Sequence, residues 1–106
     1  MYANTKDGGK FMSVVIIGGH ERMTVQYEEI CREYGYDAKV FSKKTGSFKK
    51  SIGSPDLMIL FTNTTSHKMV ISAVSEAKKM GIPIKRTHSS SAFALKTVLS
   101  GKDKFA

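Results

Sequence analysis

Apolar residues in this chain form two alternating patterns, short uninterrupted runs and longer stripes at helical spacing. The clearest runs lie at residues 11–17 and 57–61, with two more polar counterparts at 37–41 and 82–86. An apolar run without alternation is typical of a strand buried on both faces of a parallel sheet. The run at 57–61 is the most apolar and is predicted to be central. The segment at 37–41 is more polar and that at 82–86 contains Pro83, so both are predicted to be edge strands.

Between these segments, apolar residues recur every three or four positions, which is the period of an amphipathic helix. Three such stripes are predicted, made of Met23, Tyr27, Ile30, Cys31 and Tyr34, of Met69, Val70, Ala73, Val74, Ala77 and Met80, and of Ala92, Leu95, Val98 and Leu99. The helices are expected to end at glycines, which are Gly35, Gly81 and Gly101. Ser66 is predicted to cap the second helix, and residues 89–91, all serine, offer a cap for the third.

The alternation of strands and helices predicts an α/β fold with right-handed crossovers. The simplest arrangement is a three-layer Rossmann or flavodoxin-like domain with a four-stranded, mostly parallel sheet in the order 2-1-3-4. Residues 1–10 are polar and lack a period, so they are predicted to form a loose N-terminal arm. Residues 11–106 are predicted to form a single domain.

The connection between the second and third strands departs from this pattern. Residues 42–56 contain three Gly/Pro breakers and four lysines without a helical period, so they are predicted to form a long basic loop. A crossover without a helix would leave one face of the sheet partly uncovered, including side chains of the central strands. A four-stranded domain of this size would also leave two open sheet edges. We therefore expect a homo-oligomer that hides this surface.

Composition limits the kinds of binding partner and the cellular compartment that are expected. Seventeen Lys and Arg against nine Asp and Glu give a formal charge of +8, which favours anionic partners without selecting one. The single cysteine excludes an internal disulfide framework and an all-Cys metal site. The longest apolar runs are too short to span a bilayer, and no leader-like segment opens the chain. A cytoplasmic protein without a membrane partner is expected.

Polar loops follow the first, third and fourth strands, whose carboxyl ends share one edge of a parallel sheet. Each loop precedes a helix N-terminus, where free N–H groups and the helix dipole favour an anion. We therefore predict a ligand crevice between the first and third strands. Its expected lining is Gly18, Gly19, His20, Arg22, Thr62, Thr64, Ser66, His67, Lys68, His88 and Ser89.

Within this set, Arg22 is the strongest candidate for an anion ligand, because its forked guanidinium matches phosphate or carboxylate. An ion pair of Arg22 with a nearby acid is the alternative. Gly18 and Gly19 either admit a phosphate to the backbone or only permit a tight turn. His67 and Lys68 place cations in the first turn of a helix, against its dipole, which points to a functional role for His67.

Several chemistries find no support in the sequence. The glycines after the first strand do not complete a dinucleotide-binding or Walker-type motif. They also occupy the place where a phosphotransfer cysteine would stand, and Cys31 belongs to a buried helical stripe. The three histidines match no metal-ligand spacing, so no metal is predicted and no cofactor is assigned.

Three functions remain open. The favoured one is binding or sensing of a small anionic molecule, a nucleotide or another phosphate compound. The second is an enzyme acting on a phosphate or acyl ester, with His67 as the candidate catalytic acid/base. The third is a nucleic-acid or protein interaction module that uses the basic loop, in which Phe48 is surrounded by Lys43, Lys44, Lys49 and Lys50.

Three segments also resemble the bacterial DUF2325 family, namely V-V-I-I-G-G-H-E-R at 14–22, S-P-D-L-M-I-L-F-T-N-T-T-S-H-K at 54–68 and A-K-K-M-G-I-P-I at 77–84. The likeness extends over roughly residues 11–100. It implies a small Rossmann-like domain whose biochemical role is largely uncharacterised. It also implies a shared surface made by Gly18, Gly19, Arg22, Ser66 and His67. Where the family often has a glycine after the fourth strand, this chain has serine at 89–91.

Overall fold

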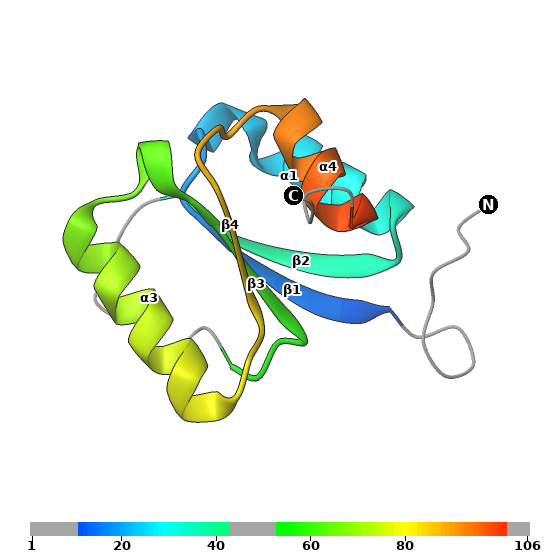
Figure 1. Cartoon of the computed structure of the whole chain (residues 1–106). Coiled ribbons are helices and arrows are strands. Elements are labelled where there is room, and N and C mark those ends of the chain that lie inside the picture. The colour runs from blue at the N-terminus through cyan, green and yellow to red at the C-terminus, as the bar shows by residue number, and fades with distance from the viewer. Residues whose placement is uncertain (1–10, 43–52, 102–106) are drawn as a thin grey trace.

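The computed structural model describes residues 11–42 and 53–101. Its strands form one parallel sheet in the order β2-β1-β3-β4, which confirms the predicted topology (Figure 1). The elements are β1 (Met12–Ile17), η1 (Glu21–Met23), α1 (Thr24–Glu33), β2 (Tyr36–Phe41), β3 (Leu57–Phe61), η2 (Thr62–Thr64), α3 (His67–Met80), β4 (Ile84–Thr87) and α4 (Ala92–Ser100). The predicted N-terminal arm and most of the predicted basic loop lie outside the described residues.

The polarity of each strand matches its place in the sheet. Every residue of β3 is buried, as the uninterrupted run at 57–61 predicted for a central strand. The polar strand β2 and the proline-preceded strand β4 lie at the two edges. The fourth strand begins at Ile84 rather than at residue 82, because Pro83 has no N–H and stands just before the ladder. The Pro83 carbonyl accepts a hydrogen bond from Met58 N–H at 2.9 Å.

Helices cover both faces of the sheet and make three layers. In Figure 1, α1 and α4 lie on one face and α3 lies on the other. The alternating side chains of β1 and β3 divide between these two faces, as the period of a strand requires. The α1–α4 side buries Val14, Ile16, Ile59, Phe61, Tyr27, Leu95 and Val98, and the α3 side buries Val15, Ile17, Met58, Leu60, Met69, Ala73 and Ala77.

The helix ends follow the capping predictions. Ser66 Oγ accepts from Met69 N–H at 3.2 Å, and Ser91 Oγ accepts from Ala94 N–H at 3.1 Å. Gly81 and Gly101 close α3 and α4 with φ of +70° and +80°. The prediction that Met80 belongs to the apolar stripe of the second helix was wrong, because this last residue of α3 is 46% exposed.

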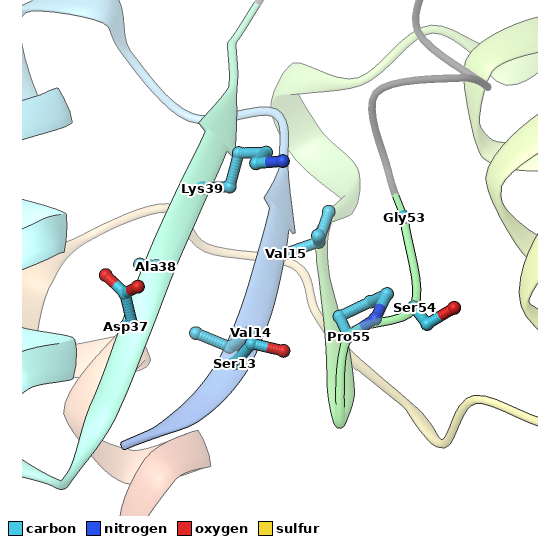
Figure 2. A pocket seen from close by; sticks show the side chains of 9 residues that line it. All are labelled: Ser13, Val14, Val15, Asp37, Ala38, Lys39, Gly53, Ser54 and Pro55. Atoms are coloured by element: carbon cyan, nitrogen blue, oxygen red, sulfur yellow. The ribbon is translucent and has the colours of Figure 1, made fainter. Parts of the chain in front are cut away.

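The expectation that side chains of the central strands would be uncovered was also wrong. Val15 is only 2% exposed, and Ile17, Met58 and Leu60 are fully buried, in one core cluster with Met69, Ala73 and Ala77 of α3. This face has a cavity of about 270 Å³ beside Pro55. The edge strand β2 contributes the polar residues Asp37 and Lys39 to its lining, as Figure 2 shows. The uncovered face therefore no longer supports a homo-oligomer, whereas β2 and β4 are edge strands of the described sheet. The oligomeric state stays a prediction.

No helix in the described part of the chain has the length and apolar character that crossing a bilayer requires. Cys31 lies fully buried on α1, between the helix and the sheet. Burial, together with the nearby charge of Glu28, raises the pKa of Cys31 from 9.0 to about 12. The thiol is therefore neutral in the folded chain at physiological pH.

This shift predicts how stability depends on pH. The unfolded chain releases the Cys31 proton near pH 9.0 and the folded chain only near pH 12, so the stabilisation contributed by the thiol falls as pH rises through this window. Urea unfolding at pH 8 and pH 10.5 should show the advantage of the natural chain over Cys31→Ala shrinking by roughly 2 kcal/mol. An unchanged difference between the two chains would contradict the shift.

Candidate functional site

The loop after β1 is built around two glycines with left-handed backbones. Gly18 and Gly19 have φ of +97° and +90°. The Gly18 N–H donates to the Phe41 carbonyl at 2.8 Å, and the Gly19 N–H donates to Thr64 Oγ1 at 2.7 Å. A Cβ on Gly18 would collide with the Thr65 hydroxyl. Both glycines are thus required by the close approach of this chain's own side chains and by the turn itself.

Tyr27, on α1, joins this loop to the loop after β4. Its hydroxyl donates to the Ser90 carbonyl at 2.7 Å and accepts from the His20 N–H at 3.3 Å. Its ring is fully buried and lies 5.2 Å from that of Phe61. A Cβ on Gly19 would come within 2.6 Å of the Tyr27 ring. The helical stripe predicted Tyr27 only as a core residue, and nothing in that spacing indicated its hydroxyl's partners.

The turn after β3 completes the connections at this edge. Asn63 N–H donates to the His88 carbonyl at 3.1 Å. The Thr65 hydroxyl donates to the Phe61 carbonyl at 2.7 Å and lies 3.4 Å from the Ile17 carbonyl. The loops after β1, β3 and β4 therefore meet at one end of the sheet, as Figure 1 shows, and are held by hydrogen bonds. The ligand crevice was predicted between β1 and β3, and the Thr64 and Thr65 side chains occupy part of that space.

The hollow at this edge lies one strand away, between the ends of β1 and β2. It has a volume of about 630 Å³ and is lined by Gly19, His20, Glu21, Arg22, Met23 and Ser42. We call it the His20–Arg22 hollow. It brings together three of the predicted ligand residues, Gly19, His20 and Arg22. Ser42 was not among the predicted ligand residues, although its place directly after β2 puts it at the same edge as the β1 loop.

Arg22 reaches this position through a short turn. It lies in η1, which precedes α1, and its side chain is exposed, as is that of His20. The Gly19 and His20 N–H groups are bonded to Thr64 and Tyr27, so these two backbone donors are not free for a ligand. The side-chain groups that line the hollow include the Arg22 guanidinium, the His20 imidazole and the Ser42 hydroxyl.

The remaining predicted ligand residues do not line this hollow. Ser66 is occupied as the N-cap of α3, and the exposed His67 and Lys68 follow it in the first turn. Thr64 Oγ1 accepts a hydrogen bond from the Gly19 N–H. The other predicted residues that do not line the hollow are Gly18, Thr62, His88 and Ser89.

Two further predictions concern metals and nucleic acids. Within residues 11–42 and 53–101, no three His, Cys, Asp or Glu side chains are grouped so that they could hold a metal ion. The lysines of the predicted basic loop, Lys43, Lys44, Lys49 and Lys50, lie outside the described residues. Their role in nucleic-acid binding stays a prediction.

Comparison with known proteins places the chain by fold and family. A family model described as "Uncharacterized protein conserved in bacteria (DUF2325)" matches residues 13–101. No curated protein matches the sequence. Among solved structures, the chain is similar to the lactose-specific IIB component domain of the phosphoenolpyruvate:carbohydrate phosphotransferase system from Streptococcus pneumoniae. The identity is 18%, the TM-score is 0.58, and the match covers 87% of this chain and 90% of that chain. At this identity the likeness shows a shared flavodoxin-like fold.

The contact between Gly19 and Tyr27 predicts the cost of filling the glycine position. Gly19→Ala adds a left-handed alanine, at about 1–2 kcal/mol, and a clash with a buried ring, at about 1–3 kcal/mol. Gly81→Ala is the matched control, since its φ is +70° and nothing lies within 4 Å of its Cβ position. Urea unfolding should show Gly19→Ala to be the less stable variant by at least about 1 kcal/mol. Equal losses would mean that the Tyr27 ring moves aside freely.

Proposed function

The chain belongs to the bacterial DUF2325 family, and from its own residues we propose that it binds a small anionic molecule, a nucleotide or another phosphate compound, in the His20–Arg22 hollow. The observation that carries the proposal is the gathering of His20, Arg22 and Ser42 around one hollow at the carboxyl edge of the sheet. This edge is where open α/β sheets bind ligands. The volume of about 630 Å³ falls within the range of small-molecule sites.

The side chains around the hollow favour an anion with a planar or tetrahedral oxygen group. Arg22 presents paired N–H donors that match two oxygens of a phosphate or carboxylate. The His20 imidazole and the Ser42 hydroxyl supply further donors beside it. Met23 provides an apolar wall for the uncharged part of the ligand.

Glu21 also lines the hollow. Like charges within a few ångströms oppose each other, so the anionic group of a ligand is expected to face Arg22 and not Glu21.

Recognition in this proposal differs from that of glycine-rich phosphate loops. In those loops, backbone N–H groups bind the phosphate at a helix N-terminus. Here the Gly19 and His20 N–H groups already have partners in Thr64 and Tyr27. Affinity should therefore depend on side chains, and chiefly on Arg22.

A ligand panel tests this dependence. Thermal shift and calorimetry with nucleoside mono-, di- and triphosphates, phosphoserine, ethanolamine phosphate and inorganic phosphate should identify at least one binder. Arg22→Ala should weaken it at least tenfold, about 1.4 kcal/mol, because a charge-assisted pair is lost.

The control is Lys68→Ala. It removes the same charge from an exposed residue of the same edge that does not line the hollow, and it should leave the affinity within about twofold, a small effect typical of a distant exposed charge. If no compound binds, or if both variants lose equal affinity, the hollow is not the anion site. A loss confined to Lys68→Ala would instead locate binding at the start of α3.

A further inference from the structure

The free edge of β4 carries a second surface that the anion site leaves unused. β4 pairs with β3 on one side and is the last strand of the described sheet, at the near edge in Figure 1. Between this strand and α3 lies a groove of about 410 Å³, lined by Val70, Ile71, Val74, Ser75, Lys78 and Arg86. We call it the α3–β4 groove.

The backbone of β4 is available along this groove. The Pro83 carbonyl points to β3, since it accepts from Met58 N–H. Backbone groups of successive residues in a strand point to opposite sides, so the N–H and C=O of Ile84 and Arg86 point away from β3. Unpaired groups of this kind at a sheet edge form a template for another extended chain.

Apolar side chains of α3 overhang the same edge. Ile71 is 55% exposed, and Val70 and Val74 are partly exposed beside it. These three lie on the flank of α3 next to the buried stripe of Met69, Ala73 and Ala77. A strand added to β4 would place alternate side chains against this apolar flank.

The charges on the groove select its occupant. Lys78 and Arg86 line it, and the described residues show no ion pair for either, whereas Lys79 pairs with Glu76 at 3.7 Å. A second copy added antiparallel through β4 would bring the Lys85–Arg86 segments of both chains together, and like charges opposite each other destabilise a strand pair. An acidic chain meets no such opposition.

From these observations we propose that the α3–β4 groove binds an extended acidic peptide, which adds as a fifth strand beside β4. Its backbone bonds to Ile84 and Arg86. One aliphatic side chain packs on Val70 and Val74, and acidic residues two positions to either side meet Arg86 and Lys78. The proposal stands independently of the anion site at the other end of the strand order.

The probe is a synthetic peptide, Ac-Thr-Glu-Thr-Val-Thr-Glu-Thr-NH2, added to the ¹⁵N-labelled full chain and followed by NMR. The amide signals of Ile84 and Arg86 and the signals of Val70 and Val74 should shift together at submillimolar to millimolar peptide. A peptide with Lys in place of Glu should bind at least tenfold more weakly. A Glu peptide N-methylated at the backbone N–H groups that face β4 should also bind at least tenfold more weakly, because it cannot donate to the strand.

Charge exchange separates recognition from loss of folding. The double variant Lys78→Glu with Arg86→Glu should lose the Glu peptide and gain the Lys peptide, which an unfolded chain could not do. Lys79→Glu changes the same charge on α3 outside the groove and should keep the preference for the Glu peptide.

Three results would overturn the proposal. The first is the absence of shifts at millimolar Glu peptide. The second is equal binding of the Glu and Lys peptides. The third is a shift of the same amides with protein concentration alone, together with a dimer in sedimentation velocity, which would assign the groove to a second copy of this chain.

Discussion

The arrangement of the carboxyl edge depends on the buried hydroxyl of Tyr27. It satisfies the His20 N–H and the Ser90 carbonyl at once, and so ties the chain after β1 to the chain after β4. A buried donor or acceptor left without a partner costs about 1–3 kcal/mol, so the two loops are held where this hydroxyl stands. The ring beneath the hydroxyl leaves room only for glycine at position 19.

This constraint explains why the hollow lies where it does. The Gly19 N–H is bonded to Thr64, and the Thr65 hydroxyl lies near the Ile17 and Phe61 carbonyls, so threonine side chains lie between the ends of β1 and β3. The chain then turns outward at His20, and Arg22 projects on the β2 side. In sheets of this kind a ligand often uses the gap at the switch point. Here hydrogen bonds of Thr64 and Thr65 at the switch point connect the loops, and the exposed side chains of His20 and Arg22 lie beside it.

The sequence predicted the fold far better than the site. Apolar runs and stripes report burial directly, so the strand order, the caps at Ser66 and Ser91 and the central place of residues 57–61 could all be inferred. The site depends on which polar groups bond to one another across 45 to 63 residues, as Gly19 with Thr64 and Tyr27 with Ser90 do. No periodicity encodes such pairs. Glycines after a strand can admit either a bound phosphate or a neighbouring threonine side chain, and only the three-dimensional structure distinguishes the two.

The burial of Cys31 bears on whether the chain could use a cysteine nucleophile. The chain shares its fold with a phosphotransferase-system domain, yet its one cysteine lies under α1, with a pKa raised to about 12 by burial and by Glu28. The loop after β1 is bonded through its backbone to Thr64 and Tyr27. A nucleophile needs exposure and an accessible charged form. The Cys31 thiol is buried and neutral, whereas Arg22 and His20 are exposed. The exposed side chains therefore support the proposal of an anion site rather than a cysteine nucleophile.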